Sequence, residues 1–165
     1  MATPIEIYEN LYVGNEQHYE GHVAREANWA TVHACKYPYH RSLVGYTNKI
    51  INTHPNYLFI EKDNRLALNM IDGPDPKYTS HELIDAALGF ISKNILAGKK
   101  VLVHCNQGQS RGPSIGLLYL LKYTDTLPKT SLIDAEKAYK TLYPIYQPMN
   151  GIRGYIEVNF QRFVS

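Results

Sequence analysis

The stretch from residue 101 to residue 123 most constrains how this chain can fold. Three apolar residues, Val101-Leu102-Val103, lead into His104 and Cys105. A short polar segment follows, then Arg111, and an apolar segment with helical spacing begins at once. This order predicts a buried strand, a tight loop and a helix that starts near the arginine.

The predicted loop has the parts of an anion-binding site. Its backbone N–H groups, curled above the positive end of a helix dipole, would form a concavity that suits a tetrahedral oxyanion. Arg111 can offer two parallel N–H bonds to phosphate oxygens. Both features stabilise a thiolate at Cys105, at the base of the loop. We expect a phosphate group to be held above this sulfur by Asn106, Gln107, Gly108, Gln109, Ser110 and Arg111.

The segment His104-Cys105-x5-Arg111 resembles the signature loop of the cysteine-dependent protein tyrosine phosphatases, in their dual-specificity branch. A bare Cys-x5-Arg is a weak motif, but the preceding histidine, Gly108, Ser110 and the flanking strand and helix make this match specific. The resemblance implies a phosphatase that works through a phosphocysteine intermediate without a metal or other cofactor. It also implies that His104 bonds the loop backbone, although a buried structural histidine fits the same position.

Cleavage of a phosphate ester also requires a proton donor for the leaving oxygen, on a separate loop. The segment Asp72-Gly73-Pro74-Asp75-Pro76 is rich in turn-forming residues and carries two carboxylates. In the dual-specificity branch, the acid follows a strand and precedes the helix that leads to the signature strand. That order selects Asp72, with Asp75 as the alternative. Either carboxylate could instead form a local turn.

One position departs from the family pattern. Most members place Ser or Thr directly after the arginine, where its hydroxyl bonds the thiolate and helps it leave. Here that position is Gly112. Either Ser110 or Ser114 supplies a hydroxyl in another way, or the phosphocysteine is hydrolysed slowly. Slow hydrolysis is our expectation.

Cys35 is the second of two cysteines. It follows a predicted strand that should lie beside the signature strand, so its sulfur could approach Cys105. Some phosphatases of this superfamily form a protective disulfide between such residues on oxidation. A small buried hydrophobic residue explains Cys35 equally well.

The rest of the sequence predicts an α/β fold in one domain over residues 1–165. Alternating apolar and polar residues predict a hairpin or two strand pieces over 5–14, a strand over 29–34, and a second hairpin over 57–71. Later helices are expected from the N-cap Thr79, over 131–143, and after a capping Asn150. The resemblance implies a central mixed sheet of about four or five strands, flanked by helices.

Composition adds limits on partners. The net charge of +2 gives no reason to expect binding to nucleic acid or a membrane. No stretch resembles a signal peptide or a membrane span, so a cytoplasmic protein, monomeric by default, is expected. The loop interior carries no Lys or Arg, which argues against highly anionic inositol lipids.

Phosphotyrosine in proteins is therefore the preferred substrate, with phosphoserine and phosphothreonine also open. A phosphatase acting on a nucleotide or RNA 5′-phosphate is one alternative. A module that binds a phosphorylated ligand without turnover is another. Sulfurtransferases and arsenate reductases also place a cysteine in an anion-binding loop, but the upstream Asp72 loop favours a phosphatase.

Overall fold

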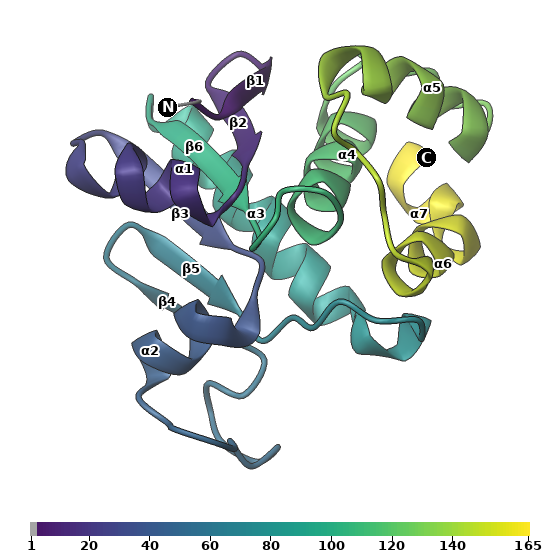
Figure 1. Ribbon diagram of the computed structural model, residues 1–165. Helices are drawn as coiled ribbons and strands as arrows, with labels where there is room; N and C mark the ends of the chain where they lie inside the picture. The colour runs from purple at the N-terminus through teal and green to yellow at the C-terminus, as the bar shows by residue number, and fades with distance from the viewer. Residues whose placement is uncertain (1–2) are drawn as a thin grey trace.

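A computed structural model describes residues 3–165, which form a six-stranded mixed sheet with helices on both of its faces (Figure 1). The strand order is β1-β2-β6-β3-β5-β4. The α/β class was predicted correctly, but the sheet has more strands than the expected four or five. The additional strands arise because both predicted hairpins join the sheet, at its opposite edges. The strands are β1 Ile5–Tyr8, β2 Leu11–Gly14, β3 Trp29–His33, β4 Phe59–Lys62, β5 Arg65–Leu68 and β6 Lys100–His104.

The four inner strands run parallel, and each edge strand is antiparallel to its neighbour. Parallel strands end at the same edge of a sheet, which is where α/β proteins bind ligands. The segments that follow β6, β3 and β5 therefore meet there. These segments begin at Cys105, Ala34 and Asn69.

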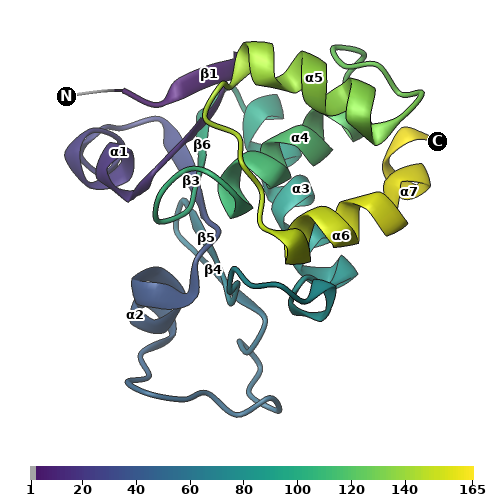
Figure 2. The ribbon, with the colours of Figure 1, turned by 45° about the vertical axis from the view of Figure 1, so that its right-hand side comes forward.

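The helices distribute unequally over the two faces of the sheet. In Figures 1 and 2, α3 and α4 lie against one face, and α5, α6 and α7 extend that layer away from the sheet. The opposite face is covered by α1 and the short helical segments that flank β3. No helix within residues 3–165 combines the length and apolarity needed to cross a bilayer. The helices are α1 Glu16–Gly21, η1 Val23–Arg25, η2 Lys36–His40, α2 Arg41–Val44, η3 Pro76–Tyr78, α3 His81–Leu96, α4 Arg111–Tyr123, α5 Leu132–Leu142, α6 Asn150–Val158 and α7 Phe160–Val164.

Strand β6 is buried on both faces, as a central parallel strand should be. Val101 and Val103 pack into the main core, between the sheet and α3 and α4. Leu102 points the other way, into a smaller cluster that contains Tyr19 and Tyr39. Because successive side chains of a strand point to opposite faces of the sheet, neighbouring residues of β6 enter different cores.

Two helix caps differ from the prediction. Helix α3 begins one residue later than expected, because Ser80 Oγ accepts the backbone N–H of Leu83 at 3.2 Å. Thr79 instead ends η3, where its N–H donates to the carbonyl of Pro76. The last helices also begin differently, because Met149 holds the N-cap position and Asn150 is already helical.

We expect the Ser80→Ala substitution to lower the free energy of unfolding by about 1 kcal/mol, because it removes the acceptor for the Leu83 N–H. Thr79→Val is the matched control, since it keeps the shape of the side chain, and its effect should be well below that of Ser80→Ala. Urea denaturation followed by circular dichroism measures both. A larger loss for Thr79→Val would return the cap to Thr79.

Candidate active site

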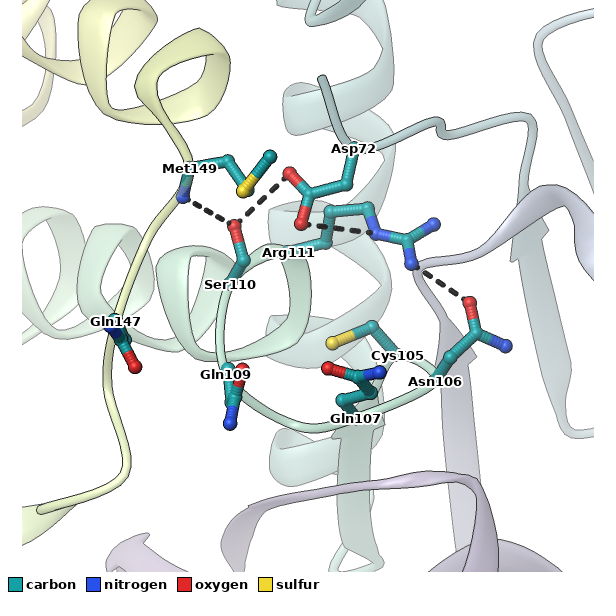
Figure 3. Close-up of a pocket in the computed structure, with 9 residues that line it drawn as sticks. All are labelled: Asp72, Cys105, Asn106, Gln107, Gln109, Ser110, Arg111, Gln147 and Met149. Carbon is teal, nitrogen blue, oxygen red and sulfur yellow. Dashed lines mark hydrogen bonds and ion pairs between the residues drawn. The ribbon is translucent and has the colours of Figure 1, made fainter. Parts of the chain in front are cut away.

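A pocket lies at the carboxyl edge of the sheet, above the end of β6 (Figure 3). It brings together most of the residues that the sequence singled out and adds Gln147 and Met149 from the segment between α5 and α6. The predicted residues that line it are Asp72, Cys105, Asn106, Gln107, Gln109, Ser110 and Arg111.

The remaining candidates lie outside the pocket wall. His104 is fully buried beneath the loop and Ser114 is fully buried in α4. Cys35 is buried at the end of β3. Asp75 is exposed and caps η3, where its side chain accepts the N–H of Lys77 at 2.9 Å. Across residues 3–165, no group of three or more His, Cys, Asp or Glu side chains is arranged to hold a metal ion.

In the loop between β6 and α4, the backbone N–H groups and the backbone carbonyls differ in their hydrogen bonding. Within residues 3–165, no group accepts a hydrogen bond from the N–H groups of residues 106–110. Most of the loop carbonyls, in contrast, are occupied from outside the loop or by the helix. The carbonyls that accept are those of Cys105, Asn106, Gly108, Gln109 and Ser110. The loop therefore presents free donors to the pocket, at the N-terminus of a helix, which is an arrangement that binds oxyanions.

Gly108 is required by this conformation. Its φ of +74° lies in the left-handed region, which residues with a side chain rarely adopt. A Cβ atom there would lie 3.0 Å from the carbonyl oxygen of Gly14 and 3.1 Å from the Tyr143 hydroxyl. That hydroxyl donates to the Gly108 carbonyl at 2.6 Å and holds the loop from below.

Arg111 begins helix α4, and its guanidinium reaches back across the loop (Figure 3). Its Nη1 donates to the carbonyl of Met70 at 2.9 Å, and its Nη2 donates to Oδ1 of Asn106 at 2.8 Å. The Nε atom is buried without a partner among the described residues. Because a buried donor without a partner is costly, Nε–H is a position where an anion would be stabilised.

Asn106 holds this arginine in place through a network of its own. Its Nδ2 donates to the carbonyl of Tyr37 at 2.9 Å and lies 3.3 Å from Oε1 of Glu16. The Glu16 N–H also donates to the Asn106 carbonyl. The segment after β3 and helix α1 therefore both fix the side of the loop that orients Arg111.

Asp72 faces the loop from the segment after β5. Ser110 Oγ donates to its Oδ1 at 3.1 Å, and its Oδ2 lies 3.9 Å from Nε of Arg111. Burial raises the pKa of Asp72, although the Ser110 hydrogen bond and the Arg111 charge oppose the shift. The carboxyl group thus retains its proton to a higher pH than an exposed aspartate would.

The segment 147–151 joins the two loops. The N–H of Gln147 donates to the carbonyl of Gln109 at 2.7 Å, and that of Met149 donates to Ser110 Oγ at 2.8 Å. The N–H of Gly151 donates to the carbonyl of Gly73 at 2.9 Å. A Cβ on Gly151 would collide with this carbonyl, so only glycine permits the contact.

Gly112 lies in the first turn of α4, pressed against the end of β6. A Cβ there would lie 3.1 Å from the backbone nitrogen of Cys105 and 3.2 Å from Cα of His104. Neither alternative serine supplies a hydroxyl to the pocket floor, since Ser110 donates to Asp72 and Ser114 lies away from the pocket. A side chain at residue 112 would therefore require the end of β6 to give way by a few tenths of an ångström.

Sequence reasoning missed Tyr143, Gln147 and Met149. Tyr143 is the last residue of the predicted helix over 131–143 and carried no motif. Gln147 and Met149 contact the loop through backbone N–H groups, which every residue except proline has. Only Pro144, which ends the predicted helix, indicated that a connecting segment follows.

Comparison with known proteins identifies the family. The family model for the catalytic domain of dual specificity phosphatases matches residues 31–161. Human dual specificity protein phosphatase 12 is 38% identical over 78 residues, which cover 47% of this chain. The match spans only 20% of the length of that protein.

Solved structures support the same fold. The crystal structure of DUSP15 superposes with a TM-score of 0.67 at 19% identity, covering 96% of this chain and 87% of that chain. Human DUSP28 gives a TM-score of 0.62 at 15% identity, covering 99% and 100%. The human tyrosine phosphatase-like serine/threonine/tyrosine-interacting protein gives 0.63 at 15% identity, covering 100% of both chains. The chain belongs to the dual specificity phosphatase family of the cysteine-dependent protein tyrosine phosphatases.

Proposed function

We propose that this protein hydrolyses phosphate monoesters in phosphorylated proteins through a phosphocysteine on Cys105, and that phosphotyrosine is the preferred substrate. The observation that carries the proposal is the hydrogen bonding of the loop. Within residues 3–165 the N–H groups of residues 106–110 have no acceptor, while every carbonyl from Cys105 to Ser110 except that of Gln107 accepts a hydrogen bond. A phosphoryl group would receive those N–H bonds together with one from Nε of Arg111, which lies 3.9 Å from Asp72 but has no hydrogen-bond partner among the described residues.

In the first step, the thiolate of Cys105 attacks phosphorus, a sulfur–phosphorus bond forms and the bond to the ester oxygen breaks. Asp72 gives its proton to that oxygen, so a neutral alcohol or phenol departs. The raised pKa of Asp72 suits this role, because the group must still hold a proton near neutral pH. Ser110 keeps the carboxyl group aimed at the pocket.

In the second step, water attacks the phosphocysteine and the Cys105 thiolate leaves. Asp72, now ionised, accepts a proton from the water, and inorganic phosphate is released. The residue after Arg111 has no hydroxyl to stabilise the departing thiolate. We therefore expect this step to be slower than the first.

The pocket walls support a protein substrate over a highly anionic one. Besides Arg111, the lining residues carry amide, hydroxyl, thioether and acidic groups and no further cation. A protein with a phosphorylated side chain brings a single phosphate, which one guanidinium and the loop amides can hold. Phosphoserine and phosphothreonine are accepted as further substrates in this proposal.

A second candidate, a module that binds phosphorylated ligands without turnover, is favoured by one observation. The Ser110 hydroxyl donates to Asp72, and Gly112 has no hydroxyl that could stabilise the Cys105 thiolate. If the Cys105 thiolate is also too weakly stabilised to attack phosphorus, the pocket would hold a phosphorylated side chain and release it unchanged.

Hydrolysis of aryl phosphates tests the proposal. The wild type should hydrolyse both 4-nitrophenyl phosphate and phenyl phosphate, and Cys105→Ser should abolish both reactions. Asp72→Asn should lower kcat/KM, which reports the first step, by about 100-fold for phenyl phosphate, the range typical of a general acid. The loss should be smaller for 4-nitrophenyl phosphate, because nitrophenolate leaves without a proton. Asp75→Asn is the matched control and should behave as the wild type.

The pH profile supplies a further check on Asp72. Since only its protonated form can act as the acid in the first step, kcat/KM should fall as pH rises through the pKa of Asp72, which burial has raised. Asp72→Asn should lose this descending limb. Equal activity in the wild type, Cys105→Ser and Asp72→Asn would overturn the assignment. Binding of a phosphotyrosine peptide without hydrolysis would favour the binding module, and preference for a nucleoside 5′-monophosphate would favour a nucleotide phosphatase.

Rapid mixing tests the slow second step. We expect a burst of nitrophenol of about one equivalent per active site, followed by a slower steady rate, because the phosphocysteine accumulates. Acid quenching during the steady phase should trap phosphate on the peptide that contains Cys105. A linear time course with no trapped phosphocysteine would contradict the expectation.

Oxidation tests the proposed pairing of Cys35 with Cys105, both of which are free thiols here. His33 and His104 are in register on adjacent parallel strands, so the two cysteines follow neighbouring strand ends. Burial raises the pKa of Cys35 to about 12, so Cys35 should remain a thiol while peroxide oxidises Cys105. The Cys35 sulfur would then attack the Cys105 sulfenic acid, forming a disulfide and releasing water.

We expect mass spectrometry of peroxide-treated protein to show the cross-linked peptide, and activity to return on reduction with a thiol. The bond should form slowly, because Cys105 packs into the main core and Cys35 into the cluster on the opposite face. In Cys35→Ser, oxidation of Cys105 should proceed to the irreversible sulfinic acid. Recovery of activity to the same extent in Cys35→Ser would argue that Cys35 is only a packing residue.

A further inference from the structure

Two fully buried histidines form a hydrogen-bonded pair beneath the loop. His33 Nδ1 lies 2.6 Å from His104 Nε2, and His104 Nδ1 lies 3.0 Å from the carbonyl oxygen of Cys105. The chain of contacts continues outward, because Nε of Arg65 donates to His33 Nε2 at 2.9 Å. The series therefore runs from β5 through β3 and β6 to the residue that carries the nucleophilic sulfur.

Arg65 sets the direction of every hydrogen bond between its own side chain and the Cys105 carbonyl. A guanidinium donates and never accepts, so His33 Nε2 must be an acceptor without a proton. The proton of neutral His33 is then on Nδ1, which donates to His104 Nε2. His104 in turn carries its proton on Nδ1 and donates to the Cys105 carbonyl. Both imidazoles are thus fixed as the Nδ1–H tautomer, although the free side chain favours Nε2–H.

Packed rings prevent either imidazole from turning. The Tyr39 ring stacks on His33 at 4.4 Å and meets His104 edge-on at 4.9 Å. The Tyr19 ring does the reverse, stacking on His104 at 5.4 Å and meeting His33 edge-on at 4.6 Å. Arg65 lies over the outer side of Tyr19, 5.4 Å from its centroid. The donor of Arg65 is thereby held in position by the same rings.

The hydrogen bond from His104 to the Cys105 carbonyl affects the loop that would bind phosphate. The carbonyl of Cys105 and the N–H of Asn106 belong to one planar trans peptide group, so they point in opposite directions. When His104 holds the carbonyl on the buried side, the N–H of Asn106 must face the other way, among the free donors of the loop.

We propose that Arg65 and His33 are positioning residues that set the tautomer of His104 and, through it, the orientation of the Cys105–Asn106 peptide in the nucleophile loop. The effect on catalysis rests on the proposed phosphatase function. The tautomers of His33 and His104 do not depend on that function, because they are a property of the protein without substrate.

Nitrogen-15 NMR of the imidazole side chains tests the series directly, since protonated and unprotonated ring nitrogens have distinct shifts. In the wild type, both His33 and His104 should show the Nδ1–H pattern. Arg65→Met keeps the stem of the side chain but has no donor, so His33 should shift toward Nε2–H and His104 should become a mixture. Arg65→Lys, which can only donate, should preserve the Nδ1–H pattern.

Turnover should follow the tautomers. Loss of one aligned hydrogen bond in the series is expected to lower kcat/KM for an aryl phosphate about tenfold in Arg65→Met, with most of the rate regained in Arg65→Lys. Arg162→Met removes an arginine from a surface ion pair with Asp85 and should leave turnover unchanged. His33→Asn, which keeps a donor near the position of Nδ1, should hold His104 as Nδ1–H.

Several outcomes would overturn the proposal. An Nε2–H pattern for His104 in the wild type would do so without any variant, even if Arg65→Met did not fold. Unchanged tautomers and unchanged turnover in Arg65→Met would do so as well. If the wild type hydrolysed no aryl phosphate but showed the expected tautomers, the phosphatase proposal would fail while the tautomer series stood. Alkylation of Cys105 by iodoacetamide, compared between wild type and Arg65→Met, would then measure the effect on the loop.

Discussion

The orientation of the peptide groups between β6 and α4 is the constraint on which the site depends. A loop this tight can present free N–H groups on one side only if its carbonyls are satisfied on the other. Four separate parts of the chain meet that demand: His104 beneath the loop, Glu16 in α1, Tyr143 after α5 and the N–H of Gln147. Buried polar groups without partners are expensive, so each of these contacts also stabilises the fold.

This constraint explains why elements remote in sequence converge on one edge of the sheet. Parallel strands β3, β5 and β6 bring their carboxyl ends together. The chain segments that leave these ends then hold Arg111 from both sides, through the Met70 carbonyl and the Asn106 side chain. The strand order therefore accounts for much of the geometry of the pocket.

The sequence was sufficient to predict those parts of the protein that depend on local pattern. Apolar alternation located the hairpins, and the signature segment identified the strand, loop and helix at the site. The start of α3 was misplaced from Ser80 to Thr79, because both residues can cap and only tertiary contacts at η3 decide between them. The contributions of Gln147 and Met149 could not be foreseen, since they are made by backbone N–H groups.

The pair His33 and His104 illustrates a second limit of prediction from the sequence. Nothing in the run from Trp29 to His33 distinguishes a histidine that bonds a neighbouring strand from one that faces solvent. The register of β3 on β6, and the placement of Arg65 one strand further out, are needed to see that the three residues form one series. Gly112 shows the converse, because the sequence reveals the missing hydroxyl but only the structure shows how closely α4 approaches β6 at this residue.

The contact of the segment 147–151 with both loops has a consequence for biosynthesis. During translation, Cys105 and its loop leave the ribosome well before Gln147 and Gly151, whose N–H groups hold the Gln109 and Gly73 carbonyls. Until those residues are available, the Gln109 carbonyl in the nucleophile loop and the Gly73 carbonyl in the Asp72 loop both lack the N–H groups that bond them in the folded protein. The loop is thus made early and completed late, because the Gln109 carbonyl finds its partner only after the segment between α5 and α6 has been made and has folded against it.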